Sequence, residues 1–199
     1  MKRLSGPIGV APVGEVPGTP LKVIAAHISG YLNLNAEVIS PIEYPNHAFD
    51  RKRFQYDAGK IISRFESMHF PDVEKIVAVF SDDLFIPIFS HVFGEARLGG
   101  KFALVSLFRL DKQPDGSTSP QAMIFERAAK VALHEIGHLF RLAHCDDNRC
   151  LMHFTGGLQS LDEISLNFCR YCNTYFQDAL RLEQDTSFSV SETKGRGIK

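Results

Sequence analysis

Residues 134–138 read His134-Glu135-Ile136-Gly137-His138, and His144 follows six residues later. Residues four positions apart lie almost one above the other on a helix, so His134 and His138 can present two imidazoles to one metal ion. His144 can supply a third nitrogen if the helix ends and the chain turns back. Three neutral imidazoles leave one tetrahedral position open for water, as in a catalytic zinc site. The stretch therefore predicts an active-site helix with a metal centre.

Glu135 directly follows the first of these histidines, where its carboxylate can take a proton from water at the metal. A lone histidine on an apolar helix face is usually a core residue, and the five-residue motif also arises by chance in soluble helices. The third histidine at this spacing argues against a chance match. We therefore predict a zinc-dependent peptidase centre, in which Glu135 is the general base and returns the proton to the leaving amine.

The composition is that of an ordinary globular chain, with 199 residues, 44% hydrophobic and 23% charged residues. We expect one domain over 1–185, with an N-terminal α/β part (1–140), a C-terminal part (141–185) and a flexible tail (186–199). The net charge of −1 gives no reason to expect nucleic acid or an anionic membrane as partner. No apolar run could span a bilayer and no signal peptide is evident, so we expect a cytoplasmic protein, and a monomer.

Short apolar runs alternate with helical patterns along the chain. Strands are expected at 8–13, 36–42, 75–80 and 101–110, and helices at 21–32, 56–68, 121–140 and 169–184. This order predicts an α/β (α+β) fold: a twisted mixed sheet with two N-terminal helices, then the active-site helix and an irregular C-terminal part. The strand at 101–110 is either a sheet edge that pairs with an extended substrate or a plain core strand.

The four cysteines, Cys145, Cys150, Cys169 and Cys172, all lie in the last third of the chain. Their spacings, C-x4-C and C-x2-C, fit four thiolates on a tetrahedral structural zinc better than two disulfides. A cysteine nucleophile at Cys145, beside His144, would leave the other three unexplained. A redox-active cluster is a further alternative, and metal analysis under reducing conditions distinguishes it from a zinc site.

Several motifs together resemble the archaemetzincin family of zinc peptidases. They are His134, Glu135, His138, His144, Cys145, Cys150, Met152, Cys169, Cys172, the segments 92–100 and 53–58, and Pro12-Val13-Gly14-Glu15. The resemblance implies a compact metzincin-like fold with two zinc ions, one catalytic on the three histidines and one structural on the four cysteines. It also implies a methionine turn at Met152 and an intracellular aminopeptidase that acts on small peptides.

The chain departs from the general metzincin pattern at two points. Arg141 stands where a glycine usually lets the active-site helix break in a left-handed conformation, which costs a non-glycine residue roughly 1–2 kcal/mol. No tyrosine follows Met152 to stabilise an oxyanion; His153 is a weak candidate, and a packing role fits it better. We treat four other histidines as structural or surface residues: His27, His47, His69 and His91. These departures motivate an alternative function, a zinc-stabilised peptide-binding or regulatory module with little turnover.

Overall fold

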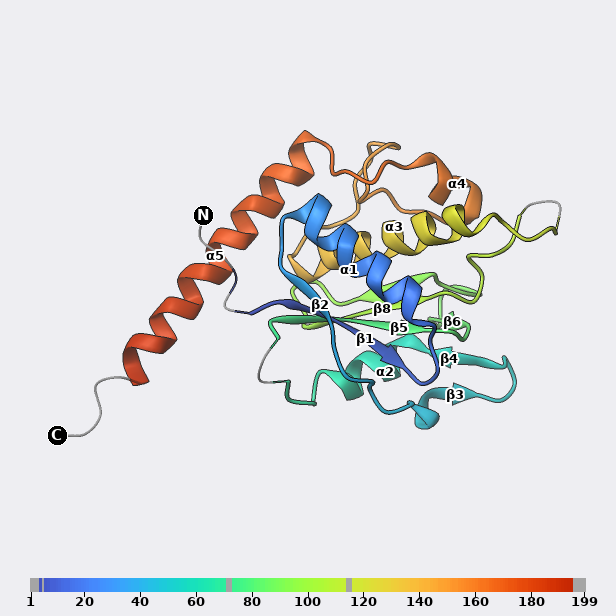
Figure 1. Ribbon diagram of the computed structural model, residues 1–199, viewed down its shortest axis with the longest axis horizontal. Helices are drawn as coiled ribbons and strands as arrows, with labels where there is room; N and C mark the ends of the chain where they lie inside the picture. The colour runs from blue at the N-terminus through green and yellow to red at the C-terminus, as the bar shows by residue number, and fades with distance from the viewer. Residues whose placement is uncertain (1–3, 5, 71–72, 114–115, 195–199) are drawn as a thin grey trace.

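The computed structural model describes residues 4, 6–70, 73–113 and 116–194, and it has a five-stranded mixed sheet at its centre (Figure 1). The strand order is β2 (Ala36–Val38), β1 (Ile8–Val13), β5 (Lys75–Phe80), β8 (Phe102–Ser106) and β7 (Gly94–Ala96). All neighbouring strands are parallel except β7, which runs antiparallel to β8. The predicted mixed sheet is confirmed.

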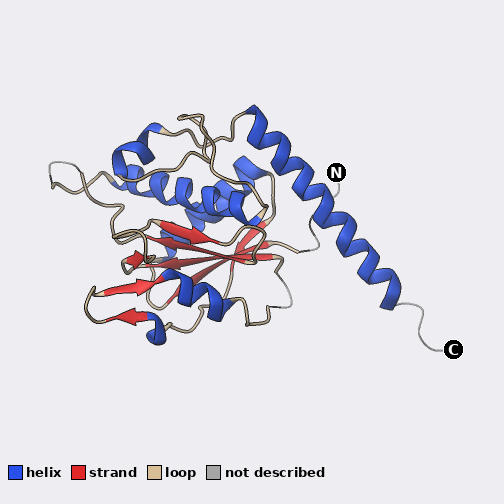
Figure 2. Cartoon of the chain, turned by 180° about the vertical axis from the view of Figure 1, so that it is seen from behind, coloured by secondary structure: helices blue, strands red, loops and turns tan. Residues whose placement is uncertain are grey.

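The three central strands β1, β5 and β8 are buried at every position. Parallel strands covered on both faces have this continuous apolar pattern. Helices α1 (Gly18–Leu32) and α3 (Gln121–Leu139) pack on one face, and α2 (Ala58–Phe65) packs on the other (Figure 2). The two N-terminal helices thus lie on opposite faces, and the active-site helix shares its face with α1.

Helix α2 is shorter than predicted because Asp57 caps it. The Asp57 carboxylate accepts a hydrogen bond from the Lys60 backbone N–H, so the helix begins at Ala58. Tyr56 belongs instead to strand β4 (Gln55–Asp57), in a small sheet with β3 (Phe49–Asp50) and β6 (Leu84–Phe85). The short 3-10 turn Asn46–Ala48 precedes this sheet.

The prediction that the strand at 101–110 forms an edge is wrong. Strand β8 lies between β5 and β7, with Phe80 paired to Ser106 on one side and Gly94 paired to Val105 on the other. The edge on this side of the sheet is the three-residue strand β7, whose weak apolar pattern gave no sequence signal. The core-strand alternative for this segment is correct.

Beyond α3 the chain is mostly irregular, with one short helix, α4 (Leu158–Glu163), before α5 (Arg170–Lys194). Helix α5 continues ten residues past the predicted end at Gln184, because neither glycine nor proline occurs before Gly195. In the first half of α5, Phe176 and Leu180 pack into the core, whereas Tyr175 and Leu182 are exposed. Residues 195–199 of the predicted tail lie outside the described residues.

Candidate active site and second metal site

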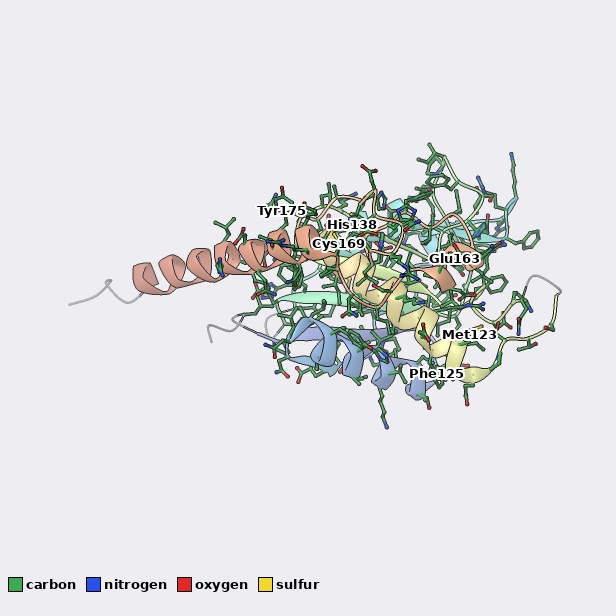
Figure 3. The ribbon with its side chains drawn as sticks, turned by 90° about the horizontal axis from the view of Figure 1, so that it is seen from above. Met123, Phe125, His138, Glu163, Cys169 and Tyr175 are labelled. Atoms are coloured by element: carbon green, nitrogen blue, oxygen red, sulfur yellow. The ribbon has the colours of Figure 1, made fainter. Side chains whose placement is uncertain are left out.

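Helix α3 and the turn after it bring the three predicted histidines together. His134, His138 and His144 each offer a ring nitrogen, and these nitrogens lie within 4.8 Å of one another. Figure 3 shows His138 near the C-terminal end of α3, far from Met123 and Phe125 near its start. The helix therefore positions two imidazoles by its own periodicity, and the third depends on the turn.

Backbone carbonyls fix the tautomers of the two helical histidines. His134 Nδ1 lies 2.7 Å from the Leu151 oxygen, and His138 Nδ1 lies 2.7 Å from the Leu142 oxygen. A carbonyl only accepts, so each Nδ1 carries the proton and each Nε2 presents a bare lone pair. The two Nε2 atoms are 3.1 Å apart, and without a proton between them this contact is not a hydrogen bond.

This arrangement fits a zinc ion. Ligand nitrogens at ~2.0–2.1 Å from a tetrahedral zinc lie roughly 3.3 Å from each other, close to the separation of the two Nε2 atoms. Burial is the main cause that lowers the pKa of His134, to about 3, and it also lowers the pKa values of His138 and His144. All three rings are therefore neutral at pH 7, as metal ligation requires.

The turn that carries His144 begins at Arg141, which adopts the predicted left-handed conformation with φ 66°. The Arg141 and Leu142 backbone N–H groups donate to the carbonyls of His138 and Gly137, and so close the helix. The Arg141 side chain packs against Gly99: a Cβ added at Gly99 would lie 2.9 Å from the Arg141 Cζ. The guanidinium is therefore not part of the described lining of the active-site cavity.

Met152 lies directly beneath the active-site helix. It is fully buried, and a Cβ added at Gly137 would collide with its sulfur. Its carbonyl accepts a hydrogen bond from the Cys145 N–H at 2.9 Å, which ties this turn to the segment that carries His144. The glycine inside the histidine motif thus lets a methionine side chain support the metal centre from below.

Glu135 is almost fully buried and lies against the edge strand. A Cβ added at Gly94 of β7 would come within 2.7 Å of the Glu135 carboxylate. Burial is the main cause that raises its pKa well above the ordinary value, and repulsion from Glu95 adds to this. A carboxyl group with a raised pKa beside a metal centre suits a group that must accept a proton and then release it.

A cavity of about 570 Å³ opens over the histidines and Glu135. Its wall includes Phe89 and His91 from the segment before β7, Glu95 of β7 itself, and Phe154 from the turn after Met152. We expected His91 to be a structural or surface residue, and the structure places it in this wall. His91 belongs to no motif, and Glu95 lies in the segment 92–100 without a predicted role, so only the pairing of β7 with β8 shows that they lie here.

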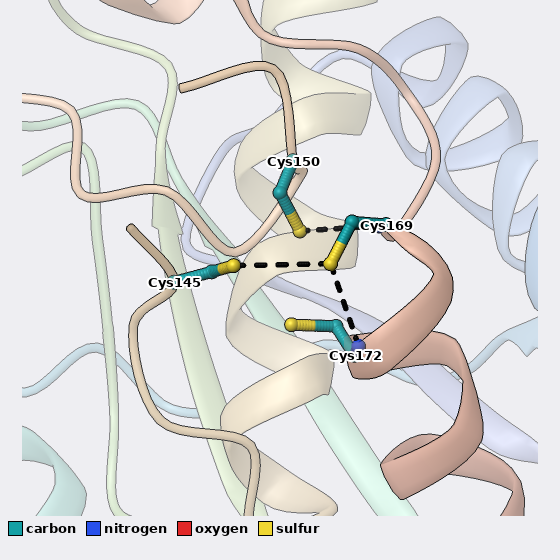
Figure 4. Close-up of side chains that lie close together, drawn as sticks. All are labelled: Cys145, Cys150, Cys169 and Cys172. Carbon is teal, nitrogen blue, oxygen red and sulfur yellow. Dashed lines mark hydrogen bonds between the residues drawn. The ribbon is translucent and has the colours of Figure 1, made fainter. Parts of the chain in front are cut away.

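The four cysteines form a second cluster beside the first (Figure 4). Their sulfur atoms lie within 4.8 Å of one another, all four thiols are free, and Cys145 Sγ is 3.8 Å from Cys169 Sγ. Sulfurs at ~2.3 Å from a tetrahedral zinc are separated by roughly 3.8 Å. The structure thus brings together all the residues of the predicted structural site.

Backbone N–H groups point at these sulfurs, as expected where thiolates bind a metal. Cys150 Sγ accepts from the Cys169 N–H at 3.2 Å and from the Met152 N–H at 3.4 Å. Burial opposes ionisation of Cys169, yet the Cys172 N–H and the neighbouring thiols lower its pKa. Burial raises the pKa of Cys150 and Cys172, so these two thiols need a cation to ionise.

His153 has a structural role in the turn. Its Nδ1 lies 2.9 Å from the Cys145 carbonyl oxygen, so the ring links the two metal-site segments. His27 contacts its own helix, through the Val23 carbonyl, and stacks on Tyr31. These positions agree with the packing interpretation of both histidines. Within the described ranges, no helix is long and apolar enough to cross a membrane.

Comparisons with known proteins agree with this geometry. The model for Peptidase family M54 matches residues 21–178. A protein of Haloquadratum walsbyi described as archaemetzincin is 32% identical over 169 residues, which cover 83% of this chain and 96% of its relative. The crystal structure of archaemetzincin from Methanopyrus kandleri superposes with a TM-score of 0.77 at 31% identity, over 89% of this chain and 97% of the other.

A third match is the crystal structure of a zinc-dependent peptidase from Methanocorpusculum labreanum, with a TM-score of 0.75, 28% identity and coverage of 85% and 99%. The sheet, the active-site helix and these likenesses together define a zinc metallopeptidase of the metzincin type. More specifically, the chain belongs to Peptidase family M54, the archaemetzincins.

Proposed function

We propose that this protein hydrolyses small peptides as an aminopeptidase, with one zinc held by His134, His138 and His144. The convergence of the bare Nε2 lone pairs of His134 and His138 at 3.1 Å carries the zinc centre of this proposal, because a cation bound between them removes their repulsion. A zinc ion at this position is a Lewis acid that lowers the pKa of water and polarises a carbonyl group.

Glu135 acts as the general base and then as the general acid. Its carboxylate takes a proton from the attacking water and delivers it to the leaving amine. Gly94, which has no side chain, leaves room for that carboxylate under the edge strand. The carbonyls of Leu151 and Leu142 hold the two imidazoles in the required tautomer.

The preference for a free amino terminus rests on the charges in the cavity. Two carboxylates, of Glu95 and Glu135, line it, and no lysine or arginine is among the described lining residues. Glu95 is therefore the acidic group of the wall with which the amino group of a substrate can pair, whereas Glu135 serves the proton transfer.

We further propose a second, structural zinc on Cys145, Cys150, Cys169 and Cys172. The sulfur separations and the N–H groups directed at the sulfurs support it. Four thiolates on one zinc require a reducing compartment, which fits a cytoplasmic protein. The monomeric state stays a prediction, and sedimentation analysis of the zinc-loaded chain tests it.

Glu135→Gln tests the mechanism directly. We expect the variant to bind two zinc ions per chain, the number that we propose for the parent, and to lose peptide hydrolysis by a factor of about 10² or more, because general acid–base catalysis is removed. Glu37→Gln, on the exposed edge strand β2, is the matched control and should keep full activity. Hydrolysis that survives in zinc-loaded Glu135→Gln would exclude this role.

A peptide-binding module is the second candidate, since no tyrosine is among the described residues that line the cavity. Incubation with a library of peptides that have a free amino terminus, at neutral pH, distinguishes the two functions. A module would retain peptides without forming product, whereas the peptidase releases shortened products that depend on Glu135.

A further inference from the structure

Two phenylalanine rings meet at the mouth of the active-site cavity. Phe89 comes from the segment between β6 and β7, and Phe154 follows two residues after Met152. Their ring centroids are 5.5 Å apart with an interplanar angle of 29°, and both rings line the cavity. The edge of Phe154 also packs on His144, with centroids 5.3 Å apart. The pair therefore connects the two lips of the cleft beside the metal centre.

Both rings remain open to an incoming ligand. Phe89 is 39% exposed and Phe154 is 46% exposed. Two further apolar side chains of the same wall are more exposed, Ile88 at 79% and Leu98 at 60%. Exposed apolar surface that continues into a cavity is typical of a ligand site rather than of a protein surface in general.

The Phe89 lip is held in place by polar contacts with the small sheet. Arg53 Nη2 donates to the Phe89 carbonyl at 3.1 Å, and Gln55 Nε2 donates to the Ser90 carbonyl at 2.9 Å. The same Gln55 amide is fixed by buried Asp83, at 2.8 Å. The backbone that carries the Phe89 ring is therefore held in place before a substrate arrives, which lowers the entropic cost of binding against it.

The rest of the wall also favours an apolar side chain. Its remaining apolar residues are Ile86, Val92, Phe93, Ala96, Val131, Ala143, Leu161 and Ile164. An acidic substrate side chain would find no lysine or arginine among the described wall residues. A basic side chain could pair with Glu95, so the experiment must distinguish this case.

We infer that Phe89 and Phe154 form an aromatic subsite that selects peptides with a large apolar or aromatic side chain next to the scissile bond. The inference rests on the proposed peptidase function. A substrate ring stacks against this pair and is covered by Ile88 and Leu98, whereas an alanine side chain reaches neither. Phe89 and Phe154 are thus specificity-determining residues, and they take no part in proton transfer.

Substitution of Phe89 tests the subsite without touching a histidine of the centre. Two peptide series, X-Ala-Ala and Ala-X-Ala with X as Ala, Leu, Phe, Lys or Glu, are compared by kcat/KM with zinc-loaded protein. We expect the parent to prefer Phe and Leu at one position, and Phe89→Ala to reduce the Phe-to-Ala ratio about tenfold. The zinc content should change little, and Phe89→Tyr should keep the ratio.

Tyr31→Ala is the matched control, because Tyr31 is also a half-exposed ring in a stacked pair, on α1 and outside the cavity wall. It should leave the ratio unchanged. A parent that cleaves every peptide of both series equally overturns the subsite, as does a ratio unaffected by Phe89→Ala. A preference for Lys that disappears in Glu95→Gln and survives in Phe89→Ala also overturns it.

Binding measurements separate this inference from the proposed function. The zinc-loaded Glu135→Gln variant, with and without Phe89→Ala, is titrated with the Phe and Ala peptides by calorimetry. A parent without any hydrolysis, together with tighter Phe binding that depends on Phe89, would refute the peptidase and keep the subsite. Equal affinity for the Phe and Ala peptides would refute the subsite whatever the activity.

Discussion

The histidine centre and the cysteine cluster are neighbours, yet the chain builds them in different ways. Two of the three histidines lie on one helix, α3, which packs on the sheet and is buried over most of its length. The four cysteines lie in the irregular segment between α3 and α5 and in the first turn of α5. The buried helix fixes the positions of two ligands of the histidine centre. The conformation of the irregular segment around the cysteine cluster depends instead on the metal that the cysteines bind. We therefore expect metal removal to affect the two regions unequally.

The largest effect should come from a strong chelator. Loss of zinc from four cysteines removes free energy of roughly 10 kcal/mol or more from the structure that they organise. We expect the region 145–172 to exchange its amide hydrogens rapidly after chelation, while β1, β5 and β8 stay protected. Hydrogen exchange with mass spectrometry measures this. Uniform protection of both regions would contradict the expectation that metal removal affects them unequally.

Acid should act on the histidine centre of the metal-free protein. His134 has a pKa of about 3 in the folded state against 6.5 for an ordinary histidine. Between these two values the unfolded chain binds more protons, so the free energy of unfolding falls as pH drops from 6.5 towards 3. The loss is about 1.4 kcal/mol per pH unit for His134 alone, and it ends below pH 3.

Urea unfolding at a series of pH values measures this slope. His134→Gln is the control, because its side chain does not titrate, and the slope between pH 6.5 and 3 should become shallower. An unchanged slope in the variant would mean that other groups cause the acid sensitivity.

Gly137→Ala should test the packing between the helix and the methionine turn. The added Cβ collides with the Met152 sulfur, so we expect overpacking to destabilise the protein by about 1–3 kcal/mol, reduced by the better helix propensity of alanine. Gly30→Ala in α1 is the matched control. Its Cβ would meet nothing within 4 Å, so the change should stabilise the protein by up to ~1 kcal/mol. Equal effects in urea unfolding would mean that Met152 moves freely.

The smallest effect should come from Arg141→Gly. The substitution removes the left-handed strain of roughly 1–2 kcal/mol, which stabilises the folded protein. It also removes the packing of the side chain on Gly99 and raises the conformational entropy of the unfolded chain, and both of these effects destabilise it. We expect these changes to cancel to within about 1 kcal/mol in thermal or urea unfolding. A stabilisation well above this value would show that the Arg141 side chain contributes nothing at the end of α3.

The sequence predicted best where chemistry or local periodicity specifies a position. The spacing of His134, Glu135 and His138 needs only one helical turn, and strands β1 and β5 were predicted at their observed bounds because each is a continuous apolar run between breaking residues. The four cysteines were grouped by their ligand chemistry. Arg141 was expected in a left-handed conformation, and it has one.

Only the tertiary structure decided which strand forms the edge and what surrounds the centre. Strand β7 has three residues and no clear pattern, and its place depends on hydrogen bonds with β8. The contact of Phe89 with Phe154 joins residues 65 positions apart, and Gly99 meets Arg141, 42 positions further along the chain. Local patterns carry no information about such pairs, because the free energy that forms them comes from burial between distant segments. The sequence alone thus determined the candidate ligands and the helix that carries two of them, and the packing of distant segments determined the cavity around the histidines.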